Sequence, residues 1–306
     1  MKSIGVLVMA YGGPSRLEEV EPYLLDVRGF RPTPPAMIAA VRERYARIGG
    51  CSPILERTVA QATALGAALA TSAPQFDISV GMRHWHPYIR DTLREMEARG
   101  ITKAVGLVMA PHFSRMSIAE YYRAVAEAGS SIEVRGIESW HLEPGYVRAV
   151  ARRVRTALAR FAAEGEPGAT VVFTAHSLPE RILSWDDPYP RQLAETVAAV
   201  MAVLGPRPHC LAYQSASHTH EPWLGPDVAD VVDALARDGA RCAVIAPIGF
   251  VSEHVEILYD LDIELAEHAA ARGVRIERIE MPGADPELIT GLAALVRRTA
   301  REAGWM

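Results

Sequence analysis

The sequence predicts an α/β fold made of two similar doubly wound domains, each with a parallel sheet. Two observations predict it: short apolar runs alternate with helical patterns along the chain, and these runs match one another in pairs in the same order. Strands that alternate with helices form parallel sheets with crossover helices. A repeated order of motifs indicates an internal duplication.

Six apolar runs have the length of buried strands. They end at Ala10, near Val80, at Ala110, at Ala175, near Tyr213 and at Ala246. Helical spacing lies between them, most clearly in residues Leu93 to Arg99 and Val228 to Arg237. The alternation therefore continues through most of the chain.

The matching runs divide the chain into two halves. The run from Val6 to Pro14 resembles the run from Val171 to Pro179, and Val108-Met-Ala-Pro resembles Val244-Ile-Ala-Pro. We therefore predict two Rossmann-like domains, residues 1–145 and 146–284, joined near His141–Gly145. The helical stretch 285–306 is expected to pack back on the first domain. Ligands of such sheets collect at the carboxyl ends of the strands, so a cleft between the domains is expected there.

Composition excludes several classes of protein. A chain of 306 residues with 49% hydrophobic content can bury two cores, and its net charge of -5 favours neither nucleic acid nor an anionic membrane. Cys51, Cys210 and Cys242 stand singly, so no disulfide framework, zinc site or iron-sulfur cluster is indicated. No apolar run is long enough for a membrane span. We expect a soluble, monomeric protein of the cytoplasm.

An acidic stripe follows the last of the six apolar runs. Glu256, Asp260 and Glu264 are spaced by four, which places their carboxylates along one face of a helix. One interpretation is a solvated helix face. The other is a carboxylate track for a cation or for protons, and the same stripe is a candidate site for an accessory divalent cation.

His176 follows a predicted strand directly, at the cleft end of the second domain. A lone histidine there is more often structural than catalytic. If Glu256 faces it, the two residues become a candidate pair for divalent-metal binding or proton transfer. Hydrolysis is disfavoured, since Ser177 lies outside any G-x-S-x-G motif.

The first domain offers phenols, guanidiniums and a hydroxyl suited to an aromatic ligand that bears carboxylates. These residues are Tyr11, Arg28, Arg31, Arg44, Tyr45, Ser52 and Tyr121. Two H-x-H pairs, His84 with His86 and His218 with His220, have spacing that suits a metal. Each pair lies beside a tryptophan and a proline, which favours packing at a loop, and we leave both unassigned.

The motifs taken together resemble those of the ferrochelatases over residues 9–264. They are MAYGGP, RYARIGGCSPI, APHFS, TAHSLPE, YQS followed by EPWLGPDV, and PIGFVSEHVEILYDLDIE. More narrowly, the chain resembles the monofunctional coproporphyrin ferrochelatases, which insert Fe(II) into coproporphyrin III in haem biosynthesis. The resemblance implies a macrocycle held between two Rossmann-like domains, with His176 and Glu256 binding iron and removing pyrrole protons. It also implies that Asp260 and Glu264 continue a metal route.

The resemblance implies Fe(II) and a porphyrin as substrates, and transient contact with an enzyme that accepts the product, coproheme. No [2Fe-2S] cluster is expected, because no cysteine follows Cys242. Where many relatives carry Arg-Arg-Gly-Arg, this chain has Arg28-Gly-Phe-Arg31, so one propionate contact is expected to be weaker or moved. Tyr11 resembles the tyrosine that coproporphyrin enzymes place beneath the iron.

Three alternatives stay open at this point. The first is a ferrochelatase acting on protoporphyrin IX, and the second is a cobalt or nickel chelatase acting on sirohydrochlorin. The third is a non-catalytic haem or porphyrin carrier that keeps Tyr11 as a ligand. The presence of both His176 and Glu256 disfavours a pure carrier.

Overall fold

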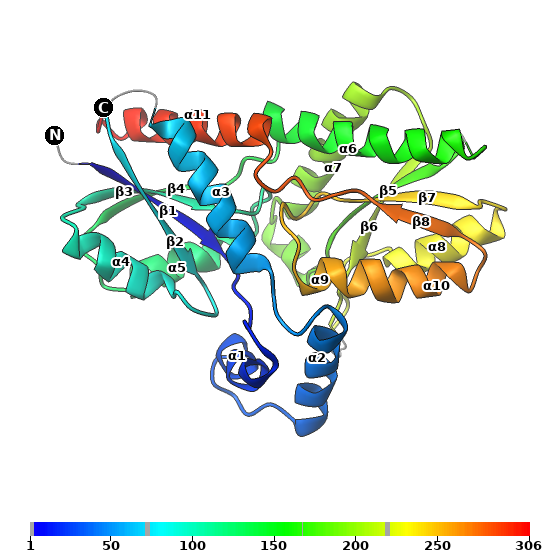
Figure 1. The fold of residues 1–306 in the computed structure, drawn as a ribbon, viewed down its shortest axis with the longest axis horizontal. Helices are drawn as coiled ribbons and strands as arrows, with labels where there is room; N and C mark the ends of the chain where they lie inside the picture. The colour runs from blue at the N-terminus through cyan, green and yellow to red at the C-terminus, as the bar shows by residue number, and fades with distance from the viewer. Residues whose placement is uncertain (1–2, 71–73, 167, 218–220) are drawn as a thin grey trace.

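Two four-stranded parallel sheets form the molecule, which a computed structural model describes for residues 3–70, 74–166, 168–217 and 221–306 (Figure 1). The first sheet has the order β2-β1-β3-β4 and the second the order β6-β5-β7-β8. The strands of the first sheet are β1 (Ile4–Ala10), β2 (Phe76–Met82), β3 (Lys103–Val108) and β4 (Glu133–Ile137). Those of the second are β5 (Thr170–His176), β6 (His209–Gln214), β7 (Cys242–Pro247) and β8 (Arg275–Arg278).

The two sheets have the same topology, strand for strand, which agrees with the predicted duplication. All pairings are parallel, and the central strands β1 and β5 each lie between two neighbours. The predicted fold class is therefore confirmed. One sheet lies on each side of residue 145, and we keep that position as the proposed domain boundary.

Each sheet is covered by helices on both faces because its strands are apolar on both faces. In β1, Val6 and Val8 pack in one core with α3 (Ile54–Leu69). Leu7 and Met9 point the other way, into a core with α4 (Ile89–Ala98) and α5 (Ile118–Glu127). In the second half, α7 (Tyr189–Leu204) and α8 (Val228–Arg237) lie on opposite faces.

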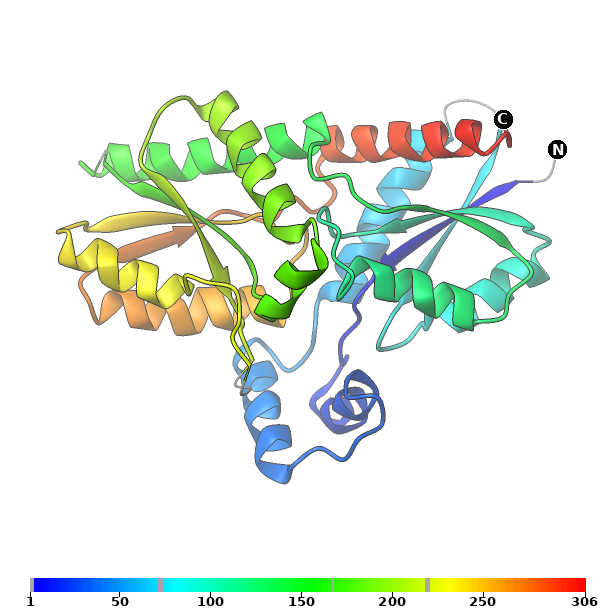
Figure 2. The same cartoon turned by 180° about the vertical axis from the view of Figure 1, so that it is seen from behind.

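Two long helices join the halves. α6 (Pro144–Ala163) and α11 (Pro286–Glu302) lie end to end along one side of the molecule, and α7 crosses α6 in the view from behind (Figures 1 and 2). α11 packs against both α3 and α6. The largest apolar core therefore contains residues of both sheets and of these four helices.

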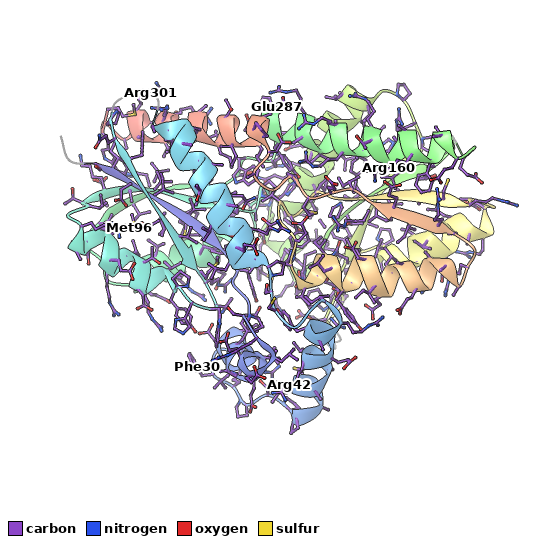
Figure 3. The ribbon with its side chains drawn as sticks, viewed as in Figure 1. Phe30, Arg42, Met96, Arg160, Glu287 and Arg301 are labelled. Carbon is purple, nitrogen blue, oxygen red and sulfur yellow. The ribbon has the colours of Figure 1, made fainter. Side chains whose placement is uncertain are left out.

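The junction of α6 and α11 is close. A Cβ atom at Gly145 would lie 2.1 Å from the carbonyl oxygen of Glu287, a residue labelled at this junction in Figure 3. Asp285 caps α11 by accepting from the backbone N–H of Glu287 and is paired with Arg152 and Arg153 of α6. Backbone contact and ion pairs together hold the two helices in line.

A small helical unit lies beside the gap between the sheets (Figure 1). It contains a 3₁₀ turn, η1 (Leu17–Glu19), α1 (Val20–Val27) and α2 (Pro35–Arg47), and its own core is Val20, Tyr23, Leu24 and Tyr45. Phe30 and Arg42 lie on this unit, away from both sheets (Figure 3). We call residues 17–47 the cap.

The structure corrects two sequence expectations. Strands β4 and β8 were not predicted, because their sequences Glu-Val-Arg-Gly-Ile and Arg-Ile-Glu-Arg are too polar to form apolar runs. The helix expected to carry the acidic stripe begins at Val255 and is not uniform. It consists of α9 (Val255–Leu258), a π-helical segment η3 (Asp260–Leu265) and α10 (Ala266–Ala270). A 3₁₀ segment, η2 (Glu180–Trp185), precedes α7.

Within the described ranges, no helix combines the length and apolar content needed to cross a membrane.

Candidate active site

A cleft of about 360 Å³ opens at the carboxyl ends of β1, β3 and β5 and receives side chains from both halves of the chain. This is the edge at which parallel sheets of this kind bind ligands. The first half contributes Tyr11, Tyr45, Ser52, Arg83, His84, His112 and Tyr121. The second contributes His176, Tyr189, His254 and Glu256.

Glu256 lies between two imidazoles. Its Oε1 is 3.5 Å from Nε2 of His176, and its Oε2 is 3.5 Å from Nε2 of His254. His176 ends strand β5, and Glu256 stands in the first turn of α9, so the sheet and the helix each place one partner. The structure thus brings together the two residues that the sequence predicts as a pair, and adds His254.

Hydrogen bonds to backbone carbonyls orient both rings and hold the backbone of Glu256 in place. Nδ1 of His176 donates to the carbonyl of Ser177, and Nδ1 of His254 donates to the carbonyl of Ser252 at 3.0 Å. Each ring therefore turns Nε2 toward Glu256, the arrangement in which an imidazole can bind a metal through Nε2. The buried Gln214 holds the backbone of Glu256 through a 2.9 Å hydrogen bond to its carbonyl.

The pair is charged in the free protein. Burial alone disfavours the His176 imidazolium, but the Glu256 charge and hydrogen bonds to that carboxylate and to Ser177 raise the pKa of His176 to about 9. Burial likewise opposes ionisation of Glu256, but the charge and hydrogen bond of His176, with help from His254, lower its pKa well below its ordinary value. At neutral pH the site therefore holds an imidazolium and a carboxylate.

The acidic stripe leads from the cleft to the surface. Glu256 is half-buried in the cleft, Asp260 is buried and Glu264 is exposed. Burial, followed by the charge of Glu256, raises the pKa of Asp260 to about 6, although Ser215 and Arg44 oppose this rise. The charges of Glu256 and Glu264 both raise the pKa of Asp260, so the three carboxylates lie close to one another. Successive binding positions for a cation require such proximity.

A π-helical turn shapes the stripe. Within η3, the N–H of Glu264 donates to the carbonyl of Tyr259, five residues earlier, at 2.9 Å. Such turns are rare and are frequent at functional sites. Ser215, with a left-handed φ of 60°, directs its hydroxyl to Oδ2 of Asp260. Strained serines of this kind also cluster at functional sites.

Tyrosines dominate the wall contributed by the first half. Tyr11 is 38% exposed in the cleft, whereas Tyr45 and Tyr121 are buried behind it. Burial, and then the charge of Glu256, raises the pKa of Tyr11 to about 12, so the free protein carries a neutral phenol there. Ser52 also lines the cleft, beside Tyr45.

The three predicted arginines do not line the cleft. Arg28, at the end of α1, places Nη1 3.5 Å from the Met37 sulfur, and the exposed Arg31 donates to the carbonyl of Arg28. Arg44 of α2 faces Asp260, with Nη1 3.5 Å from Oδ1. Tyr11, Tyr45 and Tyr121 thus line the cleft, and these three arginines lie outside its lining in this structure.

Several residues of the cleft were missed or left unassigned in the sequence, among them Arg83, His84 and His254. Arg83 pairs with Glu120 at 3.1 Å and lies over the Tyr121 ring. His84, which the sequence left as a packing residue, bonds Asp26 at 2.8 Å and has its ring 4.6 Å from that of Tyr11. His254 lies two residues before Glu256, and its place inside the SEHVE motif was the available signal.

The other H-x-H histidines give no further ligand. The His86 ring packs against Trp85 and Tyr88, as expected for a loop residue. His218 and His220 lie outside the described residues. Across the described ranges, no group of three or more His, Cys, Asp or Glu side chains is arranged to hold a metal ion. A cation at Glu256 would therefore need movement of these side chains or ligands from a bound substrate.

The fold places the chain in a class of α/β proteins built from two similar parallel sheets. Among solved structures, SirB from Bacillus subtilis with Fe³⁺ matches with a TM-score of 0.61 at 14% identity, covering 99% of this chain and 98% of that one. CbiX, described as the terminal enzyme for siroheme biosynthesis in denitrifying bacteria, matches with a TM-score of 0.52 at 13% identity, covering 97% and 99%. These likenesses show the fold alone.

Sequence comparison identifies the family within this class. The ferrochelatase family model matches residues 3–300. A ferrochelatase from Herpetosiphon aurantiacus is 40% identical over 296 residues, covering 95% of this chain and 97% of that protein. A coproporphyrin III ferrochelatase from Bacillus subtilis is 38% identical over 301 residues, covering 96% and 97%. The chain belongs to the ferrochelatase family, whose members are metal-inserting lyases.

Proposed function

We propose that this protein inserts Fe(II) into coproporphyrin III to give Fe-coproporphyrin. One observation carries the proposal: a carboxylate held between two imidazoles faces a wall of tyrosines across a cleft fed by an acidic stripe. Insertion needs a cation path, a group that exchanges protons and an aromatic surface for the macrocycle. All three meet here.

The proton balance involves both His176 and Glu256. Two pyrrole N–H protons leave the porphyrin as Fe(II) binds its four nitrogens. In the free site His176 already carries a proton, which the charge of Glu256 helps to hold. When Fe(II) reaches Glu256, its charge offsets that carboxylate, so His176 releases its proton to water. The neutral imidazole, or Glu256 if His176 binds the metal, then accepts the two pyrrole protons one after the other and passes each to water.

Iron reaches this point along the stripe. Glu264 is exposed, Asp260 is buried and Glu256 lines the cleft, so the three carboxylates form successive positions between solvent and the cleft. Asp260 is the intermediate position of the route, because it is buried and lies between Glu264 and Glu256. We assign His176 and Glu256 to catalysis, and Asp260 and Glu264 to metal transfer.

The choice of coproporphyrin rests on two supports. Tyr11 projects into the cleft, where its phenol oxygen is a hard donor suited to iron in the product. Tyr45, Ser52 and Tyr121, with Arg83, supply polar partners for propionates, of which coproporphyrin has four and protoporphyrin two. Several relatives at 36–39% identity are named coproporphyrin III ferrochelatases, although two at 40% are named only ferrochelatases.

Arg28 and Arg31 stand at the edge of the cap, and we propose that they contact propionates only if the cap moves toward the bound macrocycle. Arg28 now contacts the Met37 sulfur, and Arg31 donates to the carbonyl of Arg28. Both contacts can be exchanged for charge-assisted hydrogen bonds to a carboxylate.

One assay separates the candidate functions. Purified protein is incubated anaerobically with Fe(II) or Co(II) and with coproporphyrin III, protoporphyrin IX or sirohydrochlorin, and metallation is followed by absorbance. We expect fastest insertion of Fe(II) into coproporphyrin III. Equal or faster turnover of protoporphyrin IX would contradict the substrate assignment, faster metallation of sirohydrochlorin would indicate the second type of chelatase, and binding without turnover would indicate a carrier.

The remaining features of this function stay predictions: a monomer in the cytoplasm, transient contact with an enzyme that accepts coproheme, no iron-sulfur cluster, and an accessory divalent cation at the stripe.

A further inference from the structure

A second hollow, of about 520 Å³, lies between α11 and the linker that joins β4 to α6, residues 138–143. We call it the linker groove. Among the described residues, none lines both this groove and the cleft. Its volume is within the range of small-molecule sites. The lining residues that matter here are His141, Leu142 and Glu143 of the linker and Leu295, Arg298 and Arg301 of α11.

One end of the linker groove is basic. Arg298 and Arg301, the latter labelled on α11 in Figure 3, are three residues apart, so they lie on the same side of the helix. Arg301 has no side-chain hydrogen bond or ion pair with any described residue. Arg298 reaches Glu302 at 3.9 Å, with side chains 63% and 71% exposed, and so exposed a pair contributes little. The helix dipole favours a cation in the last turn, but it gives the guanidinium N–H donors no acceptor.

The rest of the groove is apolar in its middle and acidic at its other end. Leu295 and the exposed Leu142 contribute apolar surface from the two walls. Glu143 lies against Gly291, where an added Cβ would be 2.1 Å from the Glu143 Oε1. Gly291 and Arg301 are separated by about 15 Å along the helix axis. The Glu143 carboxylate therefore leaves the basic end without a neutralising partner.

The linker wall is already ordered in the free protein. Trp140 is buried, and its Nε1–H donates to the carbonyl of Val108 at 3.0 Å. The His141 ring is hydrogen-bonded at both nitrogens, Nδ1 to the Ser139 hydroxyl at 2.7 Å and Nε2 to Glu195 at 2.7 Å. Because these groups are held in place, a ligand that binds against them loses less conformational entropy.

We propose that the linker groove binds a small organic anion, a phosphate monoester or a carboxylate carried on an apolar body. The anionic group lies between Arg298 and Arg301, and the apolar body lies over Leu295 toward Leu142. Guanidiniums bind both kinds of anion through paired N–H donors. A phosphate, with three acceptor oxygens and a charge between -1.5 and about -2, suits two guanidiniums better than a carboxylate does.

Four probes separate the two parts of the ligand in isothermal titration calorimetry. 1-Naphthyl phosphate and 1-naphthylacetate carry an anion on an apolar body, 1-naphthol is the apolar body without the charge, and inorganic phosphate is the anion alone. We expect naphthyl phosphate to bind most tightly, and naphthol and inorganic phosphate to bind at least about tenfold more weakly. Tighter binding of naphthylacetate would support the carboxylate form of the proposal. Equal affinity for naphthol and naphthyl phosphate, or no binding of either naphthyl anion, would overturn it.

Variants of α11 test the basic end. Arg301→Met should weaken naphthyl phosphate binding about three- to tenfold, the size expected for a partly exposed guanidinium–anion contact, and Arg301→Lys should recover part of the affinity. Arg297→Met is the matched control on the same helix. Arg297 donates to the carbonyl of Leu69 at 2.9 Å and lies over the Phe76 ring, so its loss should change affinity by less than about twofold. Equal losses in Arg301→Met and Arg297→Met would overturn the proposal.

A further variant tests the shape of the groove without changing its charge. Ala294 lines the groove and is exposed, so Ala294→Trp should fold normally, as circular dichroism would show, and should block the space over Leu295. We expect it to abolish naphthyl phosphate binding. Parent-like affinity in this variant would place the probe elsewhere, the cleft included, and would overturn the proposal. These measurements need neither porphyrin nor iron, so failure of the proposed function is distinguishable from failure of this inference.

Discussion

The carboxylate of Glu256 sets the charge state of the whole site. It holds the proton on His176 and receives Nε2 of His254 at its other oxygen. Glu256→Gln keeps the shape of the side chain and removes this charge. We expect insertion to fall at least 100-fold, since both the cation position and the proton exchange depend on the carboxylate. The fall is measured from the initial rate of metallation. A decrease in this rate of less than tenfold would contradict the assignment of Glu256.

The same variant tests the ion pair through pH. The pKa of His176 is raised from 6.5 to about 9, so its pairing stabilises the fold fully below about pH 6.5, and this stabilisation is lost as pH rises through 9. The pKa of Glu256 is lowered, so its share is lost only at acid pH. Between pH 7 and 9.5 the free energy of unfolding should fall more steeply in the parent than in Glu256→Gln. Parallel curves would count against the ion pair.

His254 is one of the residues of this site that sequence reasoning overlooked. We expect His254→Gln to lower the rate constant for insertion about tenfold, because Glu256 loses one of the two groups that orient it. His86→Gln, outside the cleft, is the control and should be nearly neutral. The folded state of both variants is checked by thermal unfolding. An effect on unfolding without an effect on insertion would leave His254 a purely structural residue.

Asp260 gives the metal route a pH dependence. Since its pKa is about 6, the carboxylate is charged above this pH and neutral below it. Between pH 7.5 and 5 His176 stays protonated and Glu256 ionised, so among these three Asp260 is the group that titrates. The half-saturating Fe(II) concentration should therefore rise as pH falls through 6. Asp260→Asn should flatten this rise, and an unaltered rise would remove Asp260 from the route.

The π-helical segment shows what the spacing of residues does not predict. A spacing of four correctly predicts that Glu256, Asp260 and Glu264 share one face, but an α-helix and a π-helix satisfy that spacing about equally well. The wider turn changes which carbonyl receives the N–H of Glu264, and this follows from tertiary packing. Ser215 and Arg44, the partners of Asp260, come from distant elements and had no signal at the level of spacing.

Strands were predictable where their sequences form apolar runs. Central strands such as β1 and β5 are apolar on both faces, and their ends were predicted to within one or two residues. The edge strands β4 and β8 are partly exposed, so their sequences need not be apolar. Residues that line the cleft were likewise predicted where they lie at the ends of apolar strands and missed where they lie in loops. His176 and Tyr11 end or follow central strands, whereas Arg83 and His84 stand in a loop whose course no periodicity describes.

The α6–α11 junction depends on the absence of a side chain at Gly145. An added Cβ would meet the backbone oxygen of Glu287, which cannot rotate away as a side chain can. Gly145→Ala should therefore lower the free energy of unfolding by about 1–3 kcal/mol. Chemical denaturation measures it. Gly168→Ala, where nothing lies within 4 Å, is the control, and equal effects would contradict this account.

The two halves share one core, and this makes them a single unit of stability. Residues of both sheets pack with α3, α6, α7 and α11 in the same apolar cluster. We expect one cooperative unfolding transition, with far-ultraviolet circular dichroism and tryptophan fluorescence giving the same midpoint. Two separated midpoints would show that each half keeps its own core after the junction opens.

The packing of α11 on α3 also bears on how the protein is made. Residues 1–145 leave the ribosome first, but the face of α3 that α11 covers stays bare until residues 286–302 have been synthesised. At common translation rates this interval is on the order of 10 s. For that time the first half exposes apolar surface while the second is still emerging. The nascent chain should therefore need chaperone protection most during the second half of its synthesis.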